Sequence, residues 1–409
     1  MTIINTKPGD KNLLFLLAFC SSLSSAGTVF TLMSLSASFL IDQPDGLATA
    51  AIQTCYYAAI ALTGLIGGAI LQKFSSIFLG ILGPLISAFL TYVLSTYDHV
   101  PTTFGLIVIF IVFMLNGIEH PNLLRYFNIV LNDNERMTFF TLSESITSFL
   151  SVFSPALAAI IIIQYSVRFC FQVDSFTYLL SCIPWIFLSL RNKNRPKLSE
   201  NPAAIDFFGG FHLIIKNRNL LLLNLNRMLN NIAYVTWSTI IPLILVGHDS
   251  GKLNNFTSGQ GFCNSLIAIG FIFSGIVMTM LFKKTSRIVP MIVLATGLGF
   301  GATVFLLIFQ TNILFVYLCA FCIGFGTYCF RMTGMTLGPI YTPKEYLGPV
   351  IIASDTIVRG WSFLISVAVI FLFYFSQGTL IGLLPLFSIL SLSLLAPIVI
   401  LNRVRPLPA

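Results

Sequence analysis

The sequence predicts an all-α membrane protein with twelve transmembrane helices, on the strength of its composition and its hydropathy pattern. Hydrophobic residues make up 56% and charged residues 9% of the chain, whereas a soluble domain carries about 25% charged residues. Runs of about 20 mostly apolar residues are long enough to cross a bilayer. Such runs cover residues 13–40, 47–71, 77–97, 104–124, 137–164, 169–190, 220–246, 259–282, 288–309, 313–337, 346–375 and 379–401.

The distribution of basic residues predicts that both termini are cytoplasmic. With the N-terminus inside, seventeen of the 22 Lys and Arg residues fall in the inner segments, and only Arg168 and Lys252 fall in the outer loops. Short cytoplasmic loops carry such an excess of positive charge. The same excess accounts for the net charge of +8, so this charge does not indicate a nucleic-acid partner.

The longest inner loop, residues 191–219, divides the chain into two six-helix bundles, residues 1–190 and 220–409. The loop contains two prolines and alternating basic and polar residues, which favours a solvated cytoplasmic linker. The halves resemble each other at an offset of 210 residues, with Glu135 falling on Glu345. Many secondary transporters are built from repeated bundles, with the substrate site near the midplane where the bundles meet.

Several short motifs point to one family. They are Pro121-Asn122-Leu123-Leu124-Arg125, Glu135-Arg136, Ser154-Pro155-Ala156, Val173-Asp174-Ser175-Phe176, Leu220-Leu221 and Ile241-Pro242-Leu243. Over these motifs the chain resembles the major facilitator superfamily, and within it the branch of macrolide-efflux proteins and the enterobactin exporter. The resemblance implies a bacterial inner-membrane exporter whose substrate is a drug or a siderophore.

Two segments depart from the pattern of that family. In the loop after the second span, Gln72 replaces an acid and Ser76 replaces a base. In the fifth span, Ser154 precedes Pro155 where antiporters have glycine, and alanines follow where two glycines are common. Serine and alanine still allow close helix approach, so we expect the packing to persist.

Polar side chains within the span 346–375 are the clearest candidates for a functional site. An ionisable group placed inside a bilayer costs roughly 3 kcal/mol or more of free energy, so each such group is a functional candidate. Asp355, Arg359, Ser362 and Ser366 recur at helical spacing on one face. Asp355 can pair with Arg359 one turn later. One interpretation of this pair is functional, and the other is a structural ion pair that holds the span in place.

The span 220–246 has a similar polar face. Arg227 has no acidic neighbour one turn away on its own helix, so it requires an anion from another helix, such as Glu144, or from the substrate. The first span adds a stripe of hydroxyl side chains. The candidate substrate-binding residues are Arg227, Asn230, Asn231, Tyr234, Trp237, Arg359, Thr28 and Thr31.

Carboxyl groups within the spans are candidates for proton coupling, because a carboxyl in an apolar setting can change its protonation state. Glu144 and Asp355 are the two candidates, and the alternative for Glu144 is a neutral interface residue. A gate or interface role near the inner surface is expected for three residues, Glu119, His120 and Arg331. Asp174 is expected near the outer surface, in a structural role.

These features together predict a secondary active transporter that works by alternating access. No Gly-rich ATP-binding loop is present, so transport is passive or driven by an ion gradient. We expect a monomeric, proton-coupled exporter of a small amphipathic molecule, without cofactor or metal. The arginines favour a carboxylate-bearing siderophore over a drug, because arginine binds carboxylates bidentately.

Three alternatives remain, and two of them belong to other classes of function. An uptake transporter of the same fold would take a metabolite or a metal-loaded siderophore. A membrane sensor would need a signalling module, and the segments between the spans are too short to hold one. An enzyme is not indicated, because the four histidines lie in separate segments and no nucleophile is placed beside a base.

Labelling of introduced cysteines tests this topology. In a variant without native cysteines, Cys at Asn201 or Ser286 should react with an impermeant thiol reagent from the cytoplasm. Cys at Ser250 or Asp45 should react from outside. Labelling of position 250 from the cytoplasm alone would contradict the orientation.

Overall fold

The computed structural model describes residues 8–42, 47–131, 133–192, 207–248, 253–282, 312–337, 341–343 and 347–375. The regular structure in these ranges consists of α-helices joined by short turns. The helices are α1 (Pro8–Asp42), α2 (Leu47–Lys73), α3 (Ser76–Leu94), α4 (Thr102–Val130), α5 (Asp133–Gln164), α6 (Val167–Asn192), α7 (Phe207–Lys216), α8 (Arg218–His248), α9 (Leu253–Phe282), α11 (Ile313–Leu337) and α12 (Leu347–Phe375).

The predicted helical membrane fold is confirmed over these residues. Ten of the twelve predicted spans coincide with helices, and the predicted spans 288–309 and 379–401 lie outside the described residues. Within the described part, eight helices are long and apolar enough to cross a membrane. Shorter apolar stretches of this kind occur in α5 and α11, over Phe149–Gln164 and Ile313–Tyr328.

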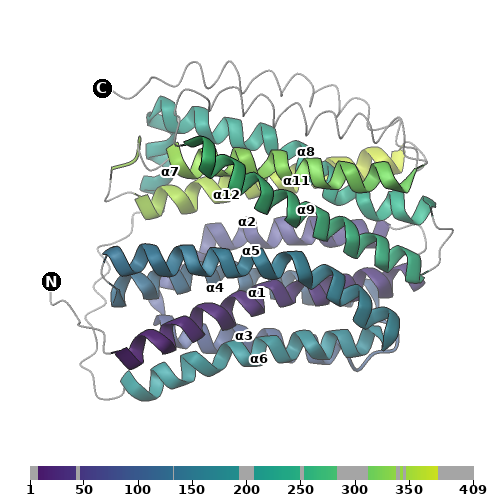
Figure 1. Ribbon diagram of the computed structural model, residues 1–409, viewed down its shortest axis with the longest axis horizontal. Coiled ribbons are helices and arrows are strands. Elements are labelled where there is room, and N and C mark those ends of the chain that lie inside the picture. The colour runs from purple at the N-terminus through teal and green to yellow at the C-terminus, as the bar shows by residue number, and fades with distance from the viewer. Residues whose placement is uncertain are drawn as a thin grey trace.

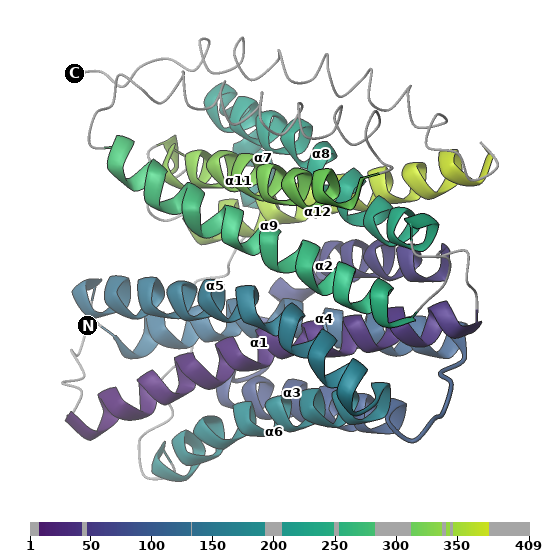
Figure 2. The ribbon, with the colours of Figure 1, turned by 45° about the vertical axis from the view of Figure 1, so that its right-hand side comes forward.

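The helices form two bundles, one from α1 to α6 and the other from α7 to α12 (Figures 1 and 2). Two helix pairs make most of the contact between the bundles: α2 packs on α12, and α5 packs on α9. At one end of the molecule lie Lys11, Lys73, Arg125, Arg191 and Lys216. We call this the basic end, and the end that holds the α1–α2 and α8–α9 connections the opposite end.

Small residues allow α5 and α9 to pack closely. A Cβ atom added at Gly261 of α9 would lie 2.8 Å from the carbonyl oxygen of Pro155 and 2.9 Å from Cβ of Ala159. A glycine on α9 thus allows the close approach to Pro155 and Ala159 of α5. Close approach of this kind is a main source of helix association in membranes.

The C-terminal part of the expected solvated linker is a helix. Ile214 of α7 is buried together with Leu220, Val350 and Ala353, so α7 packs on the first turns of α12. The spacing of Phe211 and Ile214 gives α7 one apolar face. The Asn217 side chain then caps α8, since its Oδ1 accepts from the Asn219 and Leu220 backbone N–H groups at 3.0 and 3.4 Å.

The turn between α2 and α3 is held by Arg125 at the end of α4. Its guanidinium donates to the carbonyl oxygen of Leu71 and, at 3.1 Å, to that of Phe74. The last carbonyls of a helix carry partial negative charge, which a cation near them stabilises. These carbonyls supply an electrostatic partner for Arg125 in a loop where the family's acid is replaced by Gln72. Asn122 adds a bond to the Ser76 carbonyl at 2.8 Å.

Substitution of Gly261 tests the α5–α9 contact. Gly261→Ala should lower the thermal unfolding midpoint of the purified protein by several degrees, because overpacking costs about 1–3 kcal/mol. Gly275→Ala on the same helix is the control, since its new Cβ would meet only a Tyr328 ring carbon at 3.4 Å. Equal midpoints for the two variants would show that the contact tolerates an added methyl group.

Candidate substrate and coupling site

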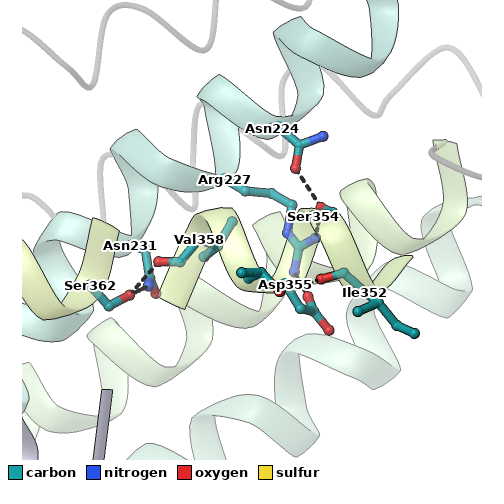
Figure 3. Close-up of polar contacts among 9 residues, drawn as sticks. Asn224, Arg227, Asn231, Ile352, Ser354, Asp355, Val358 and Ser362 are labelled. Atoms are coloured by element: carbon teal, nitrogen blue, oxygen red, sulfur yellow. Dashed lines mark hydrogen bonds and ion pairs between the residues drawn. The ribbon is translucent and has the colours of Figure 1, made fainter. Parts of the chain in front are cut away.

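A row of polar contacts joins α8 to α12 in the C-terminal bundle (Figure 3). Arg227 of α8 donates to the Ser354 hydroxyl at 2.5 Å and forms an ion pair with Asp355 at 2.6 Å. Ser354 in turn donates to Asn224 Oδ1. The anion that Arg227 requires is therefore provided by α12. The ion pair of Asp355 joins two helices, whereas the sequence suggested a pair with Arg359 along one helix.

The same row continues toward the opposite end. Asn231 donates to the Ser362 hydroxyl, which donates to the Val358 carbonyl at 2.7 Å. One turn further, Ser366 shares hydrogen bonds with Thr239 of α8 at 3.1 Å and with Thr54 of α2 at 2.7 Å. The polar face of α12 thus contacts α8 along its length and reaches the N-terminal bundle at Ser366.

Arg359 lies in an aromatic environment between the bundles. Its guanidinium lies 5.6 Å from the centre of the Tyr56 ring of α2, within the range of a cation–π interaction. Tyr57 of α2, Tyr234 of α8 and Asp355 are also close enough to interact with it electrostatically. Tyr234 is half-buried and packs against the Phe271 ring. Tyrosines of both bundles thus interact with one arginine.

Exposure along the polar face of α12 falls from the basic end to the opposite end. Near the basic end, Ile351 is 49% exposed and the Asp355 side chain is 56% exposed. Arg359 is half-buried, and Ser362 and Ser366 are fully buried. Because α7 covers the other side of these first turns, the exposed surface of Asp355 faces away from α7. Asp355 is thus exposed at the basic end of the row, whereas Ser354 beside it and the residues at the opposite end are buried.

Contacts between the bundles close the opposite end. Gln260 of α9 donates to the Ser36 hydroxyl of α1 at 3.3 Å, and Tyr57 shares a hydrogen bond of 3.1 Å with Ser238 of α8. Leu40, Tyr57, Ile241 and Leu245 are buried in one apolar cluster there. These residues lie in the half of each helix that is remote from the basic end.

A second polar row lies inside the N-terminal bundle. Glu119 of α4 accepts bonds from Ser21 at 3.1 Å and Ser24 at 3.3 Å. Asp174 of α6 is fully buried and accepts from Thr31 and, at 3.2 Å, from Thr177.

Thr28 lies between these two carboxyls. It bonds the Tyr178 hydroxyl at 2.9 Å, and Asn116 donates to both hydroxyls, at 2.8 and 3.0 Å. Thr28 and Thr31, which the sequence predicted to line the substrate site, are buried within this bundle.

The other predicted residues fall in several environments. Trp237 is almost fully buried, and its indole N–H has no partner within the described residues. His120 is exposed beside Glu119. Glu119 was expected close to the inner surface, but α4 continues to Val130, so the residue lies 11 positions, or about 16 Å, from the end of the helix. The side chains of three predicted residues lie outside the described part: Glu144, Asn230 and Arg331.

Several residues at these sites were not singled out from the sequence, and four of them are Tyr56, Tyr57, Asn116 and Tyr178. Each is an uncharged polar side chain within a predicted span. A polar group in a transmembrane segment requires a partner, which is a signal that also applies to uncharged side chains. Which helix supplies the partner depends on the fold.

Comparison with known proteins identifies the fold. The family described as the Major Facilitator Superfamily matches residues 14–365. No curated protein matches the chain. Among solved structures, the chain is similar to a POT family transporter in complex with 5-aminolevulinic acid, at 13% identity and a TM-score of 0.69, covering 98% of this chain and 96% of the other.

Two further structures are similar over almost their whole length. One is an auto-inhibited POT family peptide transporter, at 12% identity and a TM-score of 0.73, covering 98% of this chain and 99% of that one. The other is a peptide transporter in complex with sulfate, at 14% identity and a TM-score of 0.69, covering 98% of this chain and 95% of that one. At these identities the similarity establishes the fold.

A double-mutant cycle tests the ion pair between α8 and α12. Arg227→Gln and Asp355→Asn should each lower the thermal unfolding midpoint, because each leaves one charge without its partner. The double variant should be more stable than the sum of the single effects predicts. The coupling energy should be about 1 kcal/mol or less, since the Asp355 side chain is 56% exposed. Additive effects would mean that the pair contributes no interaction energy.

Proposed function

The chain belongs to the major facilitator superfamily, and on this basis we propose that it is a proton-coupled exporter of a small amphipathic organic anion. It acts by alternating access in the cytoplasmic membrane of a bacterium, with the basic end facing the cytoplasm. The substrate carries a carboxylate next to apolar groups. A carboxylate-bearing siderophore is the class we favour, and an apolar drug with an acidic group is the second.

The observation that carries this proposal is the environment of Arg359. Among the described side chains around it, Arg227 and Arg359 contribute two positive charges and Asp355 one negative charge. Asp355 already bonds Arg227, so a positive charge remains for an anionic group of the substrate. Arginine binds carboxylates through two parallel hydrogen bonds. Tyr56 and Tyr234, which are half-buried, provide surfaces for the apolar part.

The exposed end of the polar row gives a substrate a route from the basic end to Arg359. A substrate entering from the basic end meets Asp355 and Arg359 before it reaches the closed contacts at Ser362 and Ser366. An anionic substrate competes with Asp355 for the guanidinium groups of Arg227 and Arg359. The arginines can therefore exchange Asp355 for the substrate as their anionic partner. Asp355 and Glu144 remain our candidates for groups whose protonation is linked to this competition.

Uptake of a metabolite is the second candidate function. The structures similar to this chain include a POT family transporter in complex with 5-aminolevulinic acid. 5-Aminolevulinic acid carries a carboxylate, which is the group that Arg359 would bind. Direction separates the two functions: export requires transport from the cytoplasmic side toward the outside, against the concentration gradient of the substrate.

Binding by Arg359 variants tests the proposal. Arg359→Lys should weaken binding of a citrate-based siderophore with free carboxylates about tenfold or more, because lysine keeps the charge but loses the planar pair of donors. Arg359→Gln should weaken it further. Affinity for the tetraphenylphosphonium cation should not fall. Isothermal titration calorimetry on the purified protein measures both ligands, and 5-aminolevulinic acid serves as the uptake probe.

Lys216→Gln on α7 is a matched control, since it removes an exposed positive charge at the basic end. Its affinity for the siderophore should equal that of the wild type. Unchanged siderophore binding in Arg359→Gln would contradict an anion site at this arginine. Energised inside-out vesicles would then measure direction, with accumulation inside the vesicles expected for an exporter.

A further inference from the structure

The N-terminal bundle contains two carboxyls that the substrate site does not use. Glu119 is 9% exposed and Asp174 is fully buried. Both lie within helices that are long and apolar enough to span the membrane. A carboxylate placed there is costly unless a cation or several hydrogen-bond donors stabilise it.

The partners of both carboxyls are hydroxyl groups. Ser21 and Ser24 of α1 donate to Glu119, and Thr31 of α1 and Thr177 of α6 donate to Asp174. The titratable groups that interact with them electrostatically are Tyr178 with both, Cys182 with Glu119 and Cys170 with Asp174. No Lys, Arg or His contributes to either carboxyl among the described residues. Hydroxyls can stabilise either protonation state, because they both donate and accept.

The two carboxyls lie at different depths. Glu119 is about 16 Å from the basic end of α4, and Asp174 is seven residues, or about 10 Å, from the opposite end of α6. Thr28, Asn116 and Tyr178 lie between them and are hydrogen-bonded to one another. This row of polar groups therefore crosses the middle of the bundle. Glu119 lies nearer the basic end and Asp174 nearer the opposite end.

We propose that Glu119 and Asp174 are proton-binding sites of this transporter, one nearer each side of the membrane, and that the hydrogen-bonded Thr28, Asn116 and Tyr178 link their protonation states. This inference rests on the proposed proton coupling and assigns it to the N-terminal bundle, whereas the anion is bound by the C-terminal bundle. Each carboxyl takes up one proton to become neutral and releases one proton to become a carboxylate. Proton and substrate then bind at separate places, and coupling between them passes through the contact of α2 with α12.

Carbodiimide labelling tests proton binding without a substrate. Dicyclohexylcarbodiimide reacts with protonated carboxyls in apolar surroundings, taking the acidic proton onto its nitrogen as the acyl adduct forms. We expect mass spectrometry of the purified protein to find the adduct on Glu119, with at least a threefold lower rate at pH 8.5 than at pH 6. Glu119→Gln should lack it. Absence of any adduct on Glu119 or Asp174 over this range would overturn the proposal.

Proton movement in proteoliposomes tests coupling. In wild-type vesicles, a gradient of the citrate-based siderophore should drive proton movement reported by an internal pH dye. Glu119→Gln should reduce this movement at least tenfold while siderophore exchange without a gradient continues, and Glu119→Asp should recover part of it. Tyr178→Phe should slow it severalfold and provides a test if Asp174→Asn fails to fold. Asp98→Asn, which removes an exposed acid paired with Arg168 at the opposite end, should leave it unchanged.

The two proposals fail in different ways. If wild-type vesicles move no protons with the siderophore or with 5-aminolevulinic acid, the proposed coupling is wrong, and the labelling result alone decides whether Glu119 binds protons. If wild-type vesicles move protons and Glu119→Gln and Asp174→Asn both retain this movement, the inference is wrong and the coupling stands. Loss of coupling in Glu144→Gln alone would place the proton site on α5.

Discussion

The constraint on which this structure depends is that a polar group inside the membrane must find its partner within the protein. Many hydroxyls meet this requirement on their own helix. Thr63 and Thr91 donate to carbonyls one turn earlier, at 2.8 and 2.9 Å. Most of the charged and amide groups described above connect different helices instead, although Asn224 also donates to the Leu220 carbonyl of its own helix at 2.9 Å. The two rows of such contacts, between α8 and α12 and among α1, α4 and α6, therefore fix how the helices of each bundle are arranged.

The two rows differ in charge, and in our proposal one bundle binds the substrate and the other binds the proton. The described part of the C-terminal row contains Arg227, Arg359 and one carboxylate, Asp355, so it attracts anions. The N-terminal row contains two carboxyls surrounded by hydroxyls, so it suits a proton. In our proposal, a substrate anion and a proton thus bind at separate sites. Because Tyr56 of α2 contacts Arg359 and α2 packs on α12, a conformational change in either bundle alters contacts made by the other.

The fold was predictable from the sequence to a greater extent than the site. Hydropathy and the family motifs predicted ten helices that the structure describes, because apolar length alone determines whether a helix can span a membrane. The helix α7 was missed, since its ten residues are too short for that signal. Asp355 and Arg227 were recognised as candidates, because a charge in an apolar span is visible without a structure.

The partners of these candidates were harder to predict. The sequence shows that Ser21, Thr28 and Thr31 share a face of α1, but not which helix that face meets. The hydroxyl stripe was assigned to the substrate site, whereas the structure places Thr28 and Thr31 against α4 and α6. Helical periodicity determines which residues of one helix lie together. The rotation of one helix relative to its neighbours depends on packing across the whole bundle, for example on Gly261 against Pro155.

The contacts that close the opposite end are of a kind that a transporter can break and remake. Gln260 with Ser36, Tyr57 with Ser238 and Thr54 with Ser366 are hydrogen bonds between neutral side chains. Bonds of this kind contribute about 0.6 kcal/mol each in a membrane protein, so breaking these three costs about 2 kcal/mol. The ion pair of Arg227 with Asp355, in contrast, joins two helices of the same bundle and moves with them. Opening at this end therefore leaves the ion pair of Arg227 with Asp355 intact while contacts between the bundles change.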